Sequence, residues 1–184
     1  MANFYIADWH YCHRNIIAYD KRPFFDVVEM NQKLIENWNS AVKDTDTVYV
    51  LGDMFWCRTD TAIEVLNQLK GKIVLVKGNH DDVTSPDFRS RFAMIRDYME
   101  IEDGADRVVL SHYPIPCFRN HHKSWIHLYG HVHNSFEYNI IQNTSRQIRD
   151  LYEKSHRMFN VGAMMPYMNY TPRTLETILH CVSV

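Results

Sequence analysis

The order of apolar patterns along the 184 residues predicts a layered protein of α-helices and β-strands, with one mixed sheet or two packed sheets. Short runs rich in Val, Ile, Leu, Tyr and Phe are typical of buried strands, and each run ends at a polar cluster. These runs cover residues 3–7, 46–51, 72–77, 107–111, 126–130 and 157–161. Helical spacing separates the earlier runs, and no repeat or linker interrupts the chain, so we expect a single domain over residues 1–184.

The expected helices carry recognisable end signals. An apolar stripe that includes Val28 predicts a helix up to Val42, with Asp26 as its N-cap and Glu29 three residues later. A second helix should cover 60–70 and stop at Gly71. Three more are expected after Ser85-Pro86, near 145–154, and at the C-terminal end, where Thr171 is the expected N-cap and Pro172 the first helical residue.

Composition excludes several classes of protein. Hydrophobic residues make up 46% and charged residues 23% of the chain, which argues against disorder, collagen and coiled coils. The net charge of −2 gives no general reason to bind nucleic acid or a membrane surface. No leader or long apolar stretch is present, and the four cysteines form no CxxC, so we expect a cytoplasmic protein with reduced, unpaired thiols. Oligomeric state is not determined by these features.

Five polar clusters each follow an apolar run. The carboxyl ends of parallel strands meet at one edge of a sheet, where ligands bind, so clusters far apart in sequence are expected to become neighbours. Each cluster alone is also typical of an ordinary turn or a buried histidine. Their joint occurrence favours a site, formed by Asp8-Trp9-His10, Gly52-Asp53, Gly78-Asn79-His80-Asp81, Ser111-His112 and Gly130-His131-Val132-His133.

The side chains in these clusters are nitrogen and oxygen donors without a thiolate. Such a set is typical of Mn, Fe or Zn in a hydrolytic site, not of a structural zinc site. The number of donors suits two metal ions, which need a bridging carboxylate, and Asp53 is the natural bridge. Two divalent ions and two carboxylates leave a positive centre that attracts phosphate and lowers the pKa of a bound water.

The order D-x-H, G-D, G-N-H-D, a lone histidine and G-H-x-H resembles the calcineurin-like metallophosphoesterase superfamily over residues 4–163. The stretch from Asp8 to Ile16 and the late Asn160-Val161-Gly162 are similar to its small bacterial and phage members. The resemblance implies an α+β fold, a four-layer αββα sandwich with two facing mixed sheets and helices outside. It also implies two divalent ions, Mn first and Fe, Zn or Ni as alternatives, with Asp8, His10 and His133 at one, Asn79, His112 and His131 at the other, and Asp53 between them.

The same resemblance implies hydrolysis of a phosphate mono- or diester, with a small phosphodiester or nucleotide favoured. A metal-bridging hydroxide would attack phosphorus, and His80 would contact the transition state or protonate the leaving oxygen. Asp81 and Asp82 are candidates to orient its ring, but their position favours a structural role in a first turn or at the surface. Two alternatives stay open, a nuclease on polymeric DNA or RNA and a non-catalytic metal-site scaffold. The near-neutral charge weighs against the first and the presence of His80 against the second.

Substrate contacts are expected from residues near the motifs. His13, Arg119 and Lys123 are the candidates, because the loop 114–125 lies between two ligand-bearing strands and should cover the metals. Tyr11 and Cys12 replace the small glycine common after the first histidine, which predicts a narrower or aromatic mouth. Other candidates for phosphate or nucleobase contact are Arg14, Arg58, Trp9, Phe55, Trp56 and Trp125.

Overall fold

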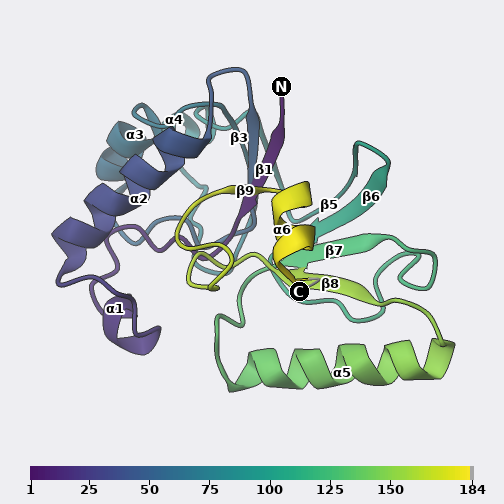
Figure 1. Cartoon of the computed structure of the whole chain (residues 1–184). Helices are drawn as coiled ribbons and strands as arrows, with labels where there is room; N and C mark the ends of the chain where they lie inside the picture. Colours follow the sequence, from purple (N-terminus) through teal and green to yellow (C-terminus); the bar gives the residue numbers. More distant parts are fainter. Residues whose placement is uncertain (183–184) are drawn as a thin grey trace.

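Two β-sheets form the centre of the protein in a computed structural model that describes residues 1–182 (Figure 1). The first has the strand order β4-β3-β2-β1-β9 and the second β5-β6-β7-β8. The strands are β1 (Asn3–Ile6), β2 (Thr47–Val50), β3 (Lys72–Val76), β4 (Met94–Arg96), β5 (Tyr98–Asp103), β6 (Asp106–Ser111), β7 (Ile126–Tyr129), β8 (Arg157–Asn160) and β9 (Arg173–Thr174).

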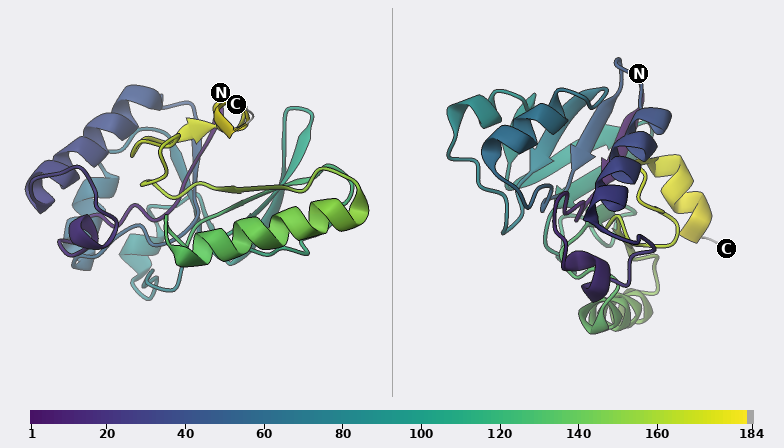
Figure 2. Two further views of the ribbon diagram at one scale, coloured as in Figure 1. Left: turned by 60° about the horizontal axis from the view of Figure 1, so that its bottom comes forward. Right: turned by 90° about the vertical axis from the view of Figure 1, so that its left-hand side faces the viewer.

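Both sheets are mixed. Strands β1 to β4 are parallel and β9 runs antiparallel to β1, while β6 to β8 are parallel and β5 runs antiparallel to β6. Helices lie outside the sheets (Figure 2), which confirms the predicted α+β class and layer order. They are α1 (Ile16–Tyr19), α2 (Val27–Ala41), α3 (Thr59–Leu66), α4 (Pro86–Arg89), α5 (Phe136–Tyr152) and α6 (Leu175–Val182).

The alternation of side chains along β6 divides the interior into two layers. Val108 and Leu110 belong to the main core between the sheets, whereas Val109 points to the opposite face and packs in a smaller cluster with Tyr129 and Met158. Helix α5 covers this smaller cluster through Tyr138 and Ile141. All six strands predicted from apolar runs are present, because each run faces apolar layers on both sides.

Helix α2 confirms its predicted N-cap. The Asp26 carboxylate accepts hydrogen bonds from the backbone N–H groups of Val28 and Glu29. Val28, expected on the buried stripe, is instead exposed, and Met30 takes a buried position. The stop at Gly71 was also wrong, because α3 ends at Leu66 and Gly71 turns the chain into β3 with φ of +87°.

Two helices in the C-terminal half begin at other residues than predicted. Helix α5 starts at Phe136, well before the expected 145, with Ser135 as its N-cap. Helix α6 starts at Leu175 and not at Pro172, since Thr174 accepts from the N–H of Thr177 and the residues before it pair in β9. Helix α1 and strands β4, β5 and β9 were not predicted, because they are short or, for β5, alternately exposed.

The carboxyl ends of β1 and β8 join the two sheets. The N–H of Ala7 donates to the carbonyl of Val161, and the N–H of Ala163 donates to the carbonyl of Ala7. This pairing brings the polar segments after β1, β2 and β3 next to those after β6 and β7. Within residues 1–182, none of the helices is long and apolar enough to cross a membrane.

A buried histidine in β7 predicts acid sensitivity. His127 is fully buried, its Nδ1–H donates to the Val109 carbonyl and its Nε2 accepts from the Ile115 N–H, so the ring is neutral. Burial lowers its pKa from 6.5 to about 4. The unfolded chain therefore takes up a proton that the folded protein excludes, and this residue lowers the free energy of unfolding by about 3 kcal/mol as pH falls from 6.5 to 4.

Denaturant titrations across that pH window test this effect. His127→Gln keeps an acceptor for Ile115 and should flatten the decline relative to the unchanged protein. His180→Gln removes an exposed histidine on α6 and should keep the original slope. Equal slopes in His127→Gln and the unchanged protein would contradict the assignment.

Candidate metal centre

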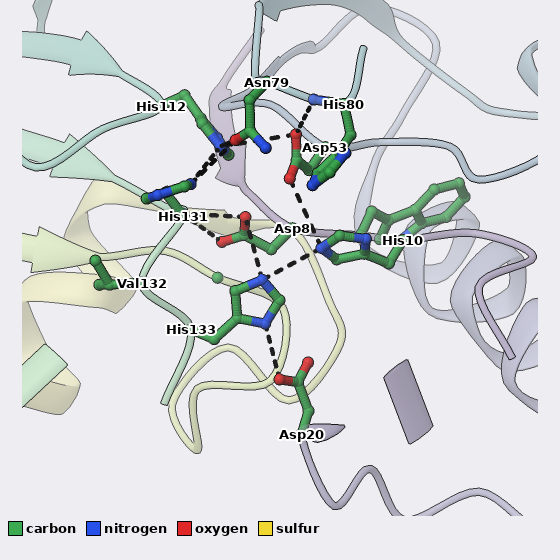
Figure 3. Close-up of polar contacts among 12 residues, drawn as sticks. Asp8, His10, Asp20, Asp53, Asn79, His80, His112, His131, Val132 and His133 are labelled. Atoms are coloured by element: carbon green, nitrogen blue, oxygen red, sulfur yellow. Dashed lines mark hydrogen bonds and ion pairs between the residues drawn. The ribbon is translucent and has the colours of Figure 1, made fainter. Parts of the chain in front are cut away.

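The predicted polar side chains meet at one end of the two sheets (Figure 3). Asp8 and His10 follow β1, Asp53 follows β2, and Asn79 and His80 follow β3. The second sheet supplies the other three, His112 after β6 and His131 and His133 after β7. The structure therefore brings together all eight side chains that the sequence analysis pooled.

The backbone at this edge is strained. Asp8, His10, Asp53, His131 and His133 all have φ between 49° and 69°. This left-handed region is uncommon for residues with a side chain, and such residues cluster at functional sites. Each turn folds a side chain back over the end of its strand and into the shared centre.

Two glycines allow the close approach of these side chains. Gly52 has φ of +85°, and a Cβ there would lie 2.3 Å from Nδ1 of His112. A Cβ on Gly130 would lie 2.6 Å from Oδ2 of Asp8. Neither atom belongs to a loose surface side chain, because Asp8 and His112 are both buried. The glycines of the G-D and G-H-x-H motifs thus make room for the functional groups.

One group of potential ligands consists of Asp8, His10 and His133, whose ligand atoms lie within 4.8 Å of one another. Nε2 of His10 is 3.3 Å from Nε2 of His133, and the latter atom is 3.9 Å from Oδ1 of Asp8. Both carboxylate oxygens of Asp8 also accept from the N–H of His131 at 3.0 Å. This group matches the set expected at the first metal ion.

Asp20 orients His133 and was missed by the sequence analysis. Its Oδ1 lies 2.8 Å from Nδ1 of His133, so the imidazole donates there and directs Nε2 toward His10. The buried Arg22 pairs with the same carboxylate and donates to the carbonyls of Asp8 and Trp9. Neither residue stands in a recognisable motif, although an acid two residues before an arginine is visible in the sequence.

A second group lies across the sheets. Asp8, Asp53 and His112 have ligand atoms within 4.8 Å of one another. Nε2 of His112 is 3.0 Å from Oδ1 of Asn79 and 3.2 Å from Nδ1 of His131. Nδ1 of His112 lies 2.8 Å from the Leu51 carbonyl and donates to it, so Nε2 carries a lone pair that faces the group.

Asp53 lies between the two groups. Its Oδ2 is 3.9 Å from Nε2 of His10, and its Oδ1 is 3.7 Å from Nε2 of His112. Oδ1 also accepts from the backbone N–H of His80 at 3.0 Å. This position is the one expected for a bridging carboxylate.

Asp81 and Asp82 take the structural role that the sequence favours and not the orienting role, because both carboxylates bond to backbone N–H groups. The Asp81 carboxylate accepts from the backbone N–H groups of Asp53, Met54 and Gly78. Asp82 accepts from the N–H of Thr84 instead. Asp81 therefore holds the two loops that carry Asp53 and His80 in fixed relative positions.

The electrostatics of the centre fit divalent cations. Burial raises the pKa of Asp8 to about 6 and lowers the pKa values of His10 and His131, so these two imidazoles are neutral. The hydrogen bond to Asp20 and the nearby Asp8 carboxylate outweigh burial at His133 and raise its pKa. Carboxylate oxygens and imidazole lone pairs then converge with few hydrogen-bond donors among them. A buried arrangement of acceptors is unfavourable without positive charge, and these nitrogen and oxygen donors are typical metal ligands.

The centre lies at the base of a cleft of about 800 Å³. His13 and Arg14 line one side of the cleft, and Trp56 and His80 line another. His13 stacks on Trp56 with ring centroids 4.1 Å apart, and its Nδ1 lies 3.3 Å from Nδ1 of His10. His13 thus contacts a candidate ligand from behind while its ring borders the cleft.

Arg119 and Lys123 do not line this cleft, contrary to the expectation for the loop 114–125. Arg119 pairs with Glu100 at 2.8 Å and lies over the ring of Trp125, and Lys123 is exposed elsewhere on the loop. Arg58 lies outside the main cleft as well. Loop residues adjacent in sequence to a ligand strand can point away from the site, and here they do.

The aromatic residues expected to contact a nucleobase differ in whether they reach the cleft. Trp9 is fully buried and Phe55 nearly so, and both pack in the core. Trp56, by contrast, keeps 42% of its surface exposed at the cleft.

Comparison with known proteins agrees with this geometry. Residues 4–161, which include every candidate ligand, match the calcineurin-like phosphoesterase family. The chain belongs to this family. Its members are metal-dependent phosphoesterases, and the buried Asp and His groups are typical of their binuclear centres.

Individual known proteins resemble the chain to different degrees. It is 34% identical over 181 residues to the uncharacterized protein MJ1445 of Methanocaldococcus jannaschii, covering 96% of this chain and 89% of that protein. The crystal structure of AQ665, a protein of unknown function from Aquifex aeolicus, superposes with a TM-score of 0.72 and 25% identity, and covers 98% of each chain. YfcE, a phosphoesterase from E. coli, gives a TM-score of 0.37 and 18% identity over 72% of this chain and 70% of its own.

Asp20 provides a test of the first group of ligands. Asp20→Asn removes the charge that holds His133 and should weaken divalent metal binding roughly 10- to 100-fold, the usual cost of losing such a partner. Calorimetric titration of the metal-free protein with Mn²⁺ measures it. Asp44→Asn, at an exposed turn, is the matched control and should bind as the unchanged protein does; an equal affinity in Asp20→Asn would refute the role.

Proposed function

We propose that this member of the family hydrolyses a phosphate mono- or diester, with a small phosphodiester or a nucleotide as substrate. The observation that carries the proposal is the placement of two groups of metal-ligand atoms at the base of a cleft with His80 at its side. The volume of about 800 Å³ lies within the range of small-molecule sites.

The residues present suit two divalent metal ions, with Mn the first choice and Fe, Zn or Ni as alternatives. Asp8, His10 and His133 would hold one ion, Asn79, His112 and His131 the other, and Asp53 both. When bound, the ions supply positive charge that binds phosphate and activate a water molecule for attack on phosphorus.

His80 is placed to act on the leaving group. Its backbone N–H is fixed by Asp53, while its exposed side chain lines the cleft. A proton donor must reach the oxygen that departs from phosphorus. Because its main chain is tied to the expected bridging residue, the His80 side chain begins at a fixed point beside any phosphate held at the centre.

Arg14 is the cation that replaces Arg119 and Lys123 in this proposal. It lines the cleft, and within residues 1–182 no hydrogen bond or ion pair occupies its side chain. Its guanidinium is therefore available to a non-reacting oxygen of the substrate.

Substitution of Asp53 should reduce metal content and activity more than substitution of a ligand that faces only one of the two groups. Asp53→Asn removes one charge from a carboxylate that faces both groups, so we expect the metal content to fall from two ions per chain to one or fewer and hydrolysis to be lost. His131→Ala, which removes a ligand of one group, should reduce activity less. Elemental analysis beside the rate measurement checks this; full activity of the metal-free protein would refute the proposed chemistry.

Replacement of His80 should separate metal binding from turnover. His80→Ala should leave the metal content unchanged and lower kcat roughly 10²- to 10⁴-fold, the range for loss of a general acid. The loss should be smaller for aryl esters, whose leaving group needs no proton, than for alkyl esters. Equal losses for both kinds of ester would show that His80 acts as an electrostatic contact and not as the acid.

A further inference from the structure

His80 borders more than the main cleft. Its side chain also lines a hollow of about 240 Å³ together with Phe55, Trp56 and Cys57. A third hollow, of about 150 Å³, shares His80, Phe55 and Cys57 and adds Arg58. The region beyond His80, seen from the metal centre, is thus a recess with aromatic side chains on its wall and one cation and two carboxylates, Asp81 and Asp82, in its outer part. We call the two smaller hollows the His80 recess.

Trp56 forms the boundary between the cleft and the His80 recess. It is 42% exposed, whereas Trp9 and Phe55, which also follow strand ends, are at most 9% exposed. The stacked His13 ring and the His80 ring, whose centroid is 4.4 Å away at a tilt of 59°, hold the indole in place. A large aromatic surface that is rigid and exposed favours binding of another planar ring, because little side-chain entropy is lost.

Arg58 adds polarity to the outer part of the His80 recess. Its side chain is 89% exposed, and its contact with Asp60 is long, at 3.9 Å. Such a surface pair contributes little to stability, so the guanidinium can exchange this partner for a ligand oxygen at small cost. The recess therefore combines a stacking surface with a hydrogen-bond donor.

The position of the His80 recess determines which part of the substrate would enter it. In hydrolysis, the water oxygen bonds to phosphorus, the bond from phosphorus to the ester oxygen breaks, and the ester oxygen takes a proton. If His80 gives that proton, the ester oxygen lies beside His80. The group attached to this oxygen must then extend away from the metal centre, along Trp56.

We infer that the His80 recess is the leaving-group subsite and that it takes an alcohol with a planar aromatic ring, a nucleoside, whose base lies against Trp56. This inference rests on the proposed function, because it uses His80 as the proton donor. It makes the substrate a nucleotide or a nucleoside phosphodiester, and the nucleoside the product that departs.

Two esters with the same scissile bond test the subsite. Adenosine 5′-monophosphate and ribose 5-phosphate both carry a primary 5′ phosphate but differ in the base. The ratio of their kcat/KM values should favour the nucleotide by roughly tenfold, within the range of one base-aromatic stack, and Trp56→Leu should abolish the preference. Because the ratio is taken within one protein, a general loss of folding or metal cancels.

Trp125→Leu is the matched control, since Trp125 is a partly exposed tryptophan on the far loop that lies outside the cleft and the recess. This variant should keep the preference for the nucleotide. A ratio near one in the unchanged protein, or an equal preference before and after Trp56→Leu, would overturn the inference.

The methyl diester of adenosine 5′-monophosphate gives a second readout, because either alcohol can leave. A nucleoside subsite beside His80 predicts release of adenosine and methyl phosphate, and Trp56→Leu should shift the products toward methanol and adenosine 5′-monophosphate. Predominant release of methanol by the unchanged protein would place the nucleoside on the other side of phosphorus and refute the subsite.

Binding measurements separate this inference from the proposed function. If the Mn²⁺-loaded protein hydrolyses none of these esters, the proposed function fails for this substrate class. The subsite is then judged by titration of the two monoesters into that protein: tighter binding of the nucleotide, lost in Trp56→Leu, supports it, and equal affinities overturn it. Hydrolysis of both esters without discrimination leaves the proposed function intact and rejects the subsite alone.

Discussion

The buried carboxylates of Asp8 and Asp53 are the constraint around which the rest of the site is arranged. Each lies at the end of a central strand, and each is almost without solvent contact. Removing a carboxylate from water is costly unless charge or hydrogen bonds compensate. Backbone N–H groups of His131 and His80 supply part of the compensation, and the remaining oxygen lone pairs point to where cations would bind.

The loops that carry these carboxylates also pay a conformational cost, and hydrogen bonds compensate for it as well. Left-handed backbone at a residue with a side chain costs about 1 to 3 kcal/mol, and five of the candidate ligands adopt it. Arg22 and Asp81 offset this cost, because each bonds to the backbone of the strained turns. Arg22 caps the carbonyls of Asp8 and Trp9, and Asp81 accepts from three N–H groups around Asp53. Two charged side chains therefore stabilise the least favourable backbone.

Most of the fold and the positions of the candidate ligands could be predicted from the sequence, because both depend on local patterns. Apolar runs that end in glycine and polar residues identify strand ends, and strand ends share an edge. Asp20 could not be found this way, since its role depends on the path of the chain back to His133. The failure of Arg119 has the same cause: proximity in sequence to a ligand strand does not determine where a loop side chain points. Strand β5 was missed because its exposure alternates and it lacks an apolar run.

The centre draws its side chains from both sheets, and this affects the mechanical behaviour of the whole molecule. Asp8, His10, Asp53 and Asn79 come from the first sheet, and His112, His131 and His133 come from the second. An ion held by atoms from both sheets would cross-link the two sheets at this end of the sandwich. Since such an ion binds only the closed arrangement, it would add its binding free energy to the work of separating the sheets. Loss of metal and opening of the sandwich would then be a single event.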